Sequence, residues 1–212
     1  MNLSDDETKI LKNRLYQIER DFLDARKKYI LYGVLTDELI KRTLRFSMLD
    51  YIYRGNIRAD NFFRVNTKLK DETKELRALY DLIPDYFKTP HKSVWLNPTF
   101  GETSLLVGGA DADLIIDGSL IDIKTVKRMQ VTEQTWSQLV GYLILSEEAR
   151  KHMEFPKIKK FGVYFSRFGK LWLIDSKCVY ESPRYKSLKN RMFKYWEKMV
   201  SQKKDLKVLP RV

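Results

Sequence analysis

Two aspartates and a lysine around an Asp-Gly turn are the residues of this chain whose types and spacing could do chemistry. Asp117-Gly118 separates two β-rich runs, a pattern that predicts a hairpin with a two-residue type I′ turn. In that register Asp113 faces Asp122, and Lys124 follows on the same strand. Side chains alternate between the faces of a strand, so these three share one face. Facing carboxylates repel each other unless a proton or a cation lies between them.

A hard divalent cation is the simplest partner for this pair of carboxylates. Mg²⁺ binds a few carboxylate oxygens and keeps several of its waters, so Asp113 and Asp122 predict half of a site for Mg²⁺ or Mn²⁺. The same register puts Asp111 opposite Lys124. The apolar residues expected on the other face are Leu114, Ile116, Ile121 and Ile123. The alternative is a structural hairpin with scattered charges, because Asp-x-Lys also arises by chance.

The pattern Asp-x₈-Asp-x-Lys resembles the signature of the PD-(D/E)XK nuclease superfamily. Asp113, Asp122 and Lys124 carry it, with Ala112 where the family often has proline. The resemblance implies that both aspartates and the backbone carbonyl of Ile123 hold one or two Mg²⁺ or Mn²⁺ ions. It also implies that Lys124 orients the attacking water and stabilises the pentavalent transition state of phosphodiester hydrolysis.

A second motif lies downstream, in a stretch from Thr132 that is predicted to be helical. Gln138 and Tyr142 are four residues apart on one face of that helix. Gln-x-x-x-Tyr is similar to the extra motif of the RecB-like exonuclease branch, which implies that the two residues position the DNA strand or the hairpin. The alternative is a helix that only packs on the sheet, with Gln138 in solvent. The single cysteine, Cys178, departs from the iron–sulfur members of that branch.

A third metal-proximal acid is expected on a helix before the hairpin, because many superfamily members place one there. In the helix predicted over about 67–86, Glu72 falls near the centre of the apolar face and Glu75 at its edge. A carboxylate on such a face is costly to bury without a partner. Glu72 is therefore the first candidate metal ligand, followed by Glu75 and Asp50. The alternative is that Glu72 only pairs with Lys68 or interacts with the helix dipole.

The composition favours a polyanionic partner. The chain of 212 residues has 40 Lys and Arg against 28 Asp and Glu, a formal net charge of +12. This balance is typical of DNA-binding proteins. The sequence has neither a run of about eighteen apolar residues nor a signal peptide at its acidic N-terminus, so we expect no membrane contact and an intracellular location.

The order of predicted elements favours an α/β fold, with a mixed central sheet flanked by helices. We expect one domain over 1–212, with a nuclease core at about 68–174 and helical additions at 4–54 and 183–204. Ser4 to Glu7 fits a capping box before a long helix, which Gly33 should end. The apolar seam of that helix predicts packing within the domain, and a homodimer is the alternative. Its members are Leu11, Leu15, Ile18, Phe22, Ala25 and Tyr29.

The resemblance implies a metal-dependent DNA nuclease. The small size and the dimer alternative favour a structure-selective endonuclease that cuts branched recombination or replication intermediates, similar to archaeal junction resolvases. Gln138 and Tyr142 instead favour a RecB-like exonuclease. A DNA-binding protein that has lost catalysis on a nuclease fold is the third alternative. The chain also resembles small basic proteins of spindle-shaped viruses of thermophilic archaea, which would place it in the cytoplasm of an infected cell.

Overall fold

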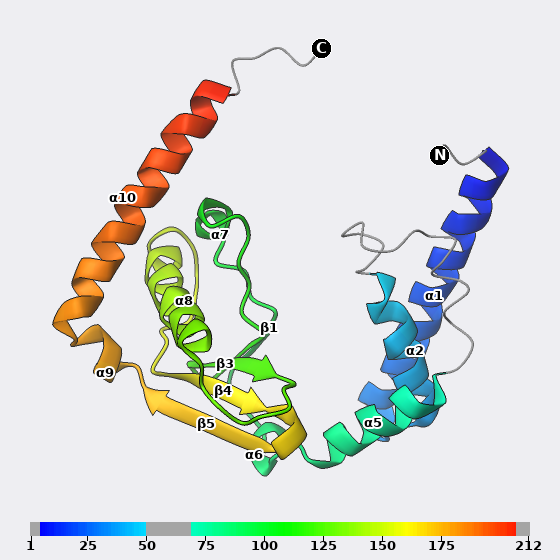
Figure 1. Cartoon of the computed structure of the whole chain (residues 1–212). Coiled ribbons are helices and arrows are strands. Elements are labelled where there is room, and N and C mark those ends of the chain that lie inside the picture. The colour runs from blue at the N-terminus through cyan, green and yellow to red at the C-terminus, as the bar shows by residue number, and fades with distance from the viewer. Residues whose placement is uncertain (1–4, 50–68, 207–212) are drawn as a thin grey trace. The chain divides into compact units, whose positions relative to one another are not determined.

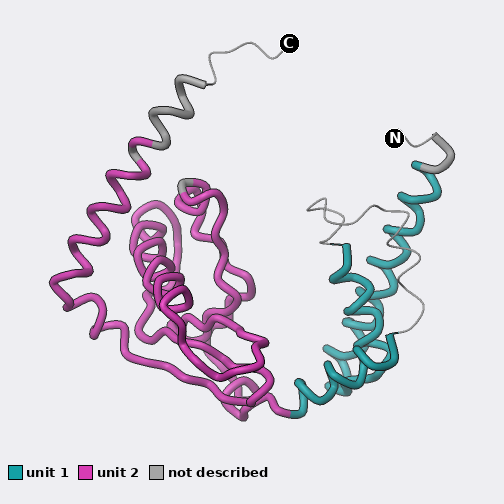
Figure 2. Tube along the Cα trace, viewed as in Figure 1, with its two compact units in different colours: residues 1–81 teal, residues 82–212 magenta. Residues whose placement is uncertain are grey.

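The computed structural model of this chain describes residues 5–49 and 69–206. The chain divides into two compact units, residues 1–81 and 82–212 (Figure 2). The expectation of one domain over 1–212 stays a prediction. Of the described helices, none is both long and apolar enough to cross a membrane.

The N-terminal unit contains three described helices, α1 (Asp5–Tyr32), α2 (Asp37–Ser47) and α5 (Lys70–Asp81). The seam of α1 faces its own unit: Phe22 stacks on Phe46 of α2 with ring centroids 4.4 Å apart. Tyr29 forms a hydroxyl–hydroxyl hydrogen bond with Tyr80 of α5. Gly33 ends α1 with a φ of 67°, as predicted. The seam proposed as a dimer contact is therefore occupied by helices of the same chain.

The helix that carries Glu72 differs from its prediction. Within the described residues α5 is shorter than expected, and Pro84 precedes a separate helix, α6 (Asp85–Lys88). The buried position on α5 is Thr73, whose hydroxyl donates to the carbonyl of Leu69. Glu72 itself is exposed, so its expected place on the buried face was wrong. Ser4 and residues 50–54 of the helical addition predicted over 4–54 lie outside the described residues.

The C-terminal unit is α/β, as predicted, with a five-stranded mixed sheet flanked by helices (Figure 1). The strands are β1 (Val94–Leu96), β2 (Leu114–Ile116), β3 (Ser119–Lys124), β4 (Lys160–Phe165) and β5 (Lys170–Asp175), in that spatial order. β3 and β4 are parallel, and the other neighbours are antiparallel. The parallel pair needs a crossover, which α8 (Glu133–His152) supplies.

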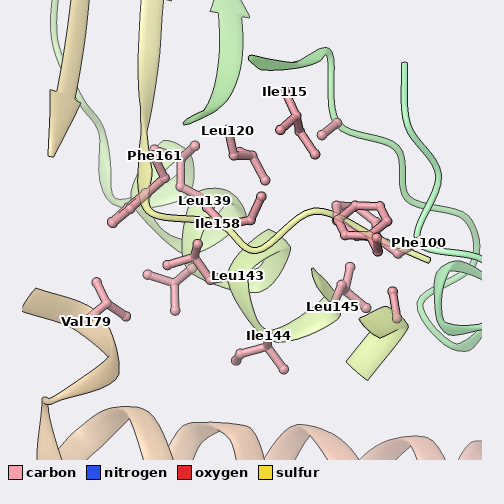
Figure 3. Close-up of a cluster of buried hydrophobic side chains, with 14 of the residues drawn as sticks. Phe100, Ile115, Leu120, Leu139, Leu143, Ile144, Leu145, Ile158, Phe161 and Val179 are labelled. Carbon is pink, nitrogen blue, oxygen red and sulfur yellow. The ribbon is translucent and has the colours of Figure 1, made fainter. Parts of the chain in front are cut away.

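Each face of the sheet buries its own apolar cluster. On one face, Ile115, Leu120 and Phe161 pack against Leu139 and Leu143 of α8, as Figure 3 shows. The chain also closes this face with the short helix α9 (Lys177–Tyr180) and the long helix α10 (Pro183–Leu206). The second face buries Leu114, Ile116, Ile121 and Tyr164, with Tyr86 and Phe87 of α6 against them.

An apolar run before the hairpin is helical. Ser104–Val107 has the composition of a strand that could lead to Asp111, but residues Glu102–Leu106 form α7. Ser104 explains the difference, because its buried hydroxyl accepts a hydrogen bond from the Phe100 amide and donates to the Ala110 carbonyl. These hydrogen bonds hold the segments before and after α7 against the helix. The β1–β2 connection is thereby a compact helical loop.

Candidate active site

The hairpin has the predicted turn and register. Asp117 and Gly118 have φ values of 49° and 80°, the left-handed conformation that a type I′ turn requires at both positions. Ile116 pairs with Ser119, and Leu114 with Ile121. Side chains at odd positions of β2 and even positions of β3 therefore face α8, as Ile115 and Leu120 do. Asp122 and Lys124 of the signature are among them, whereas Asp113 comes just before the first residue of β2.

The Asp117 carboxylate forms hydrogen bonds between this turn and the segment before β1. Its Oδ1 accepts hydrogen bonds from the backbone amides of Lys92 and Ser93, at 3.0 and 2.9 Å. Its Oδ2 lies 3.1 Å from Nδ1 of His91, whose Nε2 contacts the Tyr86 carbonyl. The Ser93 amide, together with His91 and the Lys92 amide, holds the pKa of Asp117 below its ordinary value.

The hairpin ladder stops just before the candidate metal site. A continued ladder would pair Ala112 with Ile123, but the Ala112 amide donates to the Pro98 carbonyl instead. The Ile123 amide donates to Oδ2 of Asp113 at 2.6 Å. The amide and carbonyl of one strand residue point to the same side, so the Ile123 carbonyl is on the Asp113 side of β3. The predicted ligands Asp113 and Ile123 are thus adjacent.

Asp122 is a carboxylate buried at the bottom of this site. The residue is 3 % exposed, and burial raises its pKa above the ordinary value. Asp113 raises it further, and the Lys124 ammonium opposes both effects. Lys124 Nζ lies 2.9 Å from Oδ2 of Asp122, an ion-pair contact without good hydrogen-bond geometry. Within the described residues this Oδ2 has no hydrogen-bond partner.

Gln138 and Tyr142 of α8 are linked to Lys124 by hydrogen bonds. The Lys124 ammonium donates to Oε1 of Gln138 at 2.9 Å, and Nε2 of Gln138 donates to the Tyr142 hydroxyl at 2.8 Å. Burial raises the pKa of Tyr142, and the negative charges of Asp122, Asp113 and Asp111 add to this effect, so the hydroxyl stays protonated. Gln138 is therefore a bridge between the lysine and the tyrosine.

The donor set fits a hard divalent cation in part. Two carboxylates and one backbone carbonyl are oxygen ligands, and the buried Oδ2 of Asp122 still lacks a hydrogen-bond donor. Within residues 5–49 and 69–206, however, His, Cys, Asp and Glu side chains nowhere gather in a group of three that could hold a metal. Glu72 and Glu75 are exposed on α5 of the other unit, and Asp50 is outside the described residues. The third acid remains a prediction.

Some details of the site could not be read from the sequence. Asp111 was expected opposite Lys124, but this prediction was wrong. Asp111 instead forms an isolated β-bridge with Thr99, because the chain after β1 continues alongside the segment that leads to β2. The hydroxyl of buried Ser166 bonds Thr125 at 2.8 Å and donates to the Lys124 carbonyl at 3.4 Å. Ser166 comes from the end of β4, and only the parallel register of β3 and β4 brings it here.

Comparison of the chain with protein-family models, with curated proteins and with solved structures finds no match.

Proposed function

We propose that the unit of residues 82–212 is a metal-dependent nuclease that hydrolyses DNA phosphodiester bonds. The observation that carries the proposal is the ion pair of Asp122 and Lys124 on the sheet face toward α8, with Gln138 bonded to the lysine. The Asp113 carboxylate is held beside them by the backbone amide of the residue between the two. A hairpin selected for stability alone would gain little from a buried carboxylate with an unsatisfied oxygen. The excess of basic residues supports an anionic substrate.

Each residue has a distinct role in the proposed reaction. Asp113, Asp122 and the Ile123 carbonyl would hold Mg²⁺ or Mn²⁺. Bound there, the ion would supply a water of lowered pKa and neutralise charge on the phosphate. The Lys124 ammonium, held by Gln138, donates hydrogen bonds toward the attacking water and the phosphate oxygens. Tyr142 keeps Gln138 in the orientation that presents its amide oxygen to the lysine.

Different observations favour an endonuclease, an exonuclease and a non-catalytic DNA-binding protein. A structure-selective endonuclease for branched DNA agrees with the small size of the chain, but the α1 seam no longer argues for a dimer because α2 packs against it. The hydrogen-bonded chain from Lys124 through Gln138 to Tyr142 favours the RecB-like exonuclease alternative. A DNA-binding protein without catalysis is favoured by one observation, the incomplete acid set in the described residues.

Cleavage of four DNA substrates separates these functions. Labelled four-way junction, linear duplex, single strand and closed circle are incubated with Mg²⁺, Mn²⁺ or EDTA. An endonuclease for branched DNA cuts the junction first, whereas an exonuclease degrades linear DNA and leaves the closed circle intact. Asp122→Asn should lose metal-dependent cutting, and Glu154→Gln, a change at an exposed acid of the same unit, should retain it.

The lysine gives a second test of the proposal. Lys124→Ala removes the ammonium that faces the phosphate, so we expect cleavage to fall by about 10²–10³-fold while DNA affinity changes little. Single-turnover cleavage and a binding titration in EDTA measure the two effects separately. An unchanged cleavage rate would remove Lys124 from the mechanism, and binding without cutting under every metal would support the non-catalytic alternative.

A further inference from the structure

A cavity of about 400 Å³ lies in the C-terminal unit between α8, α9 and α10, away from the signature residues. Its α8 wall is formed by Trp136 and Val140. The site residues Gln138 and Tyr142 follow each of these by two positions, about 200° around the helix, so the cavity and the candidate active site use opposite sides of α8. The volume is within the range of small-molecule pockets.

The wall from α10 combines charge with apolar surface. Arg184, Leu188 and Arg191 recur at helical spacing on one side of α10 and line the cavity. The two arginines are about two turns, or about 10 Å, apart along the helix. None of the ion pairs among the described residues involves either guanidinium, whereas Lys189 of the same helix is paired with Glu147 of α8 at 2.6 Å. No acidic residue is among the described residues that line the cavity.

The wall from α8 offers an aromatic surface. Trp136 is 37 % exposed, although its ring packs on that of Phe161 with centroids 5.6 Å apart. One side of the indole is therefore fixed by the core while part of it stays accessible. Val140, Val179 and Leu188 add apolar walls. An aromatic ring beside two guanidiniums matches a ligand that has a flat ring and one or two phosphates.

We propose that this cavity binds a nucleoside phosphate, with the base against Trp136 and phosphate oxygens on Arg184 and Arg191. The ligand is either a free nucleotide or one unit of a single strand whose neighbouring phosphates reach the two arginines. The inference does not rest on the proposed nuclease, because the cavity shares no lining residue with that site.

Cys178 provides a reporter inside the cavity. It is the only cysteine of the chain, is exposed, and is one of the lining residues. Its alkylation by iodoacetamide, a neutral reagent, can be followed by mass spectrometry on the full chain carrying Asp122→Asn, in EDTA, so that cleavage plays no part. A short oligothymidylate and thymidine monophosphate are the probes, and inorganic phosphate is the control ligand.

We expect bound nucleotide to slow the alkylation of Cys178 by about tenfold at saturation, since the occupied cavity shields the thiol. Equal protection by the monophosphate and the oligomer identifies a free nucleotide as the occupant, whereas protection by the oligomer at much lower concentration identifies a strand. No protection by either probe, or equal protection by inorganic phosphate, overturns the proposal.

Matched variants test the assigned contacts. Arg184→Gln and Arg191→Gln should each raise the nucleotide concentration needed for protection by about tenfold. Lys186→Gln removes the same charge from the opposite side of α10 and should change it by less than about twofold. Trp136→Phe should weaken protection more than Trp172→Phe, at a tryptophan of equal 37 % exposure. Equal effects of the three charge changes would mean diffuse charge attraction, and equal effects of the two tryptophan changes would mean that the base does not contact Trp136. Either result would refute a built site.

Discussion

Replacing Asp122 by asparagine should stabilise the protein in the absence of divalent cations. The carboxylate is buried, and its folded-state pKa is raised above its ordinary value, so its ionised form lowers the stability of the native state. Asparagine keeps the shape without the charge. The Lys124 ammonium loses its ion pair in this variant but keeps its hydrogen bond to Gln138.

The sign and size of the effect follow from proton linkage. Below the unfolded-state pKa of aspartate, about 3.9, both proteins hold a neutral side chain at this position and should be equally stable. As the pH rises through the raised folded-state pKa the parent loses stability, by about 1.4 kcal/mol for each pH unit by which folding raises that pKa. Asp122→Asn does not have this loss.

A divalent cation should make the parent more stable than Asp122→Asn. Mg²⁺ at about ten times its dissociation constant stabilises the parent by about 1.4 kcal/mol, which for a unit of this size is a rise in Tm of about 5 °C. Asp122→Asn lacks one carboxylate ligand and should show a much smaller rise. The experiment is thermal unfolding from pH 3 to 8 with and without Mg²⁺, with Glu154→Gln as control. A variant less stable than the parent at neutral pH without metal would refute the reasoning.

The other predictions concern the positioning of the lysine and the strength of the scaffold. Gln138→Ala leaves Lys124 without its amide acceptor and should slow single-turnover cleavage by about tenfold, with little change in Tm. Gly162→Ala should prevent stable folding, because an added Cβ would lie 1.9 Å from a backbone carbonyl oxygen of β5. Gly141→Ala, in open space on α8, should instead stabilise by about 1 kcal/mol in chemical denaturation. Asp117→Ala should lower the Tm at neutral pH. Because folding lowers the Asp117 pKa, the difference from the parent should vanish only as the pH falls through that pKa.

The hairpin and its face pattern could be predicted from the sequence because both are local. An Asp-Gly pair fixes the turn, the turn fixes the register, and the register decides which side chains face α8. The residues that decide this structure are neighbours in the chain. The contact between Lys124 and Gln138 was not predicted, since the resemblance implied only that Gln138 positions the DNA strand or the hairpin.

Other features depend on contacts that sequence spacing does not contain. Glu72 was placed on a buried face because the leucines of α5 were assumed to define it, but the helix instead buries Thr73. The run around Ser104 has the apolar composition of a strand, and only the hydrogen bonds of its hydroxyl favour a helix. The cavity beside Trp136 is formed by α8 together with α9 and α10, which follow it only after β4 and β5, so no local pattern indicates it.

The turn at Asp117-Gly118 also limits how this chain can be altered. Hairpin tips usually tolerate insertions because they are exposed and make few contacts. Here Gly118 is buried, its carbonyl accepts hydrogen bonds from the amides of Lys159 and Lys160 before and at the start of β4, and an added Cβ would lie 2.7 Å from the Lys157 carbonyl oxygen. The turn thus contacts β4 as well as the two strands that it connects, β2 and β3. We therefore expect the protein not to tolerate an affinity tag, a circular permutation point or an inserted segment at this position.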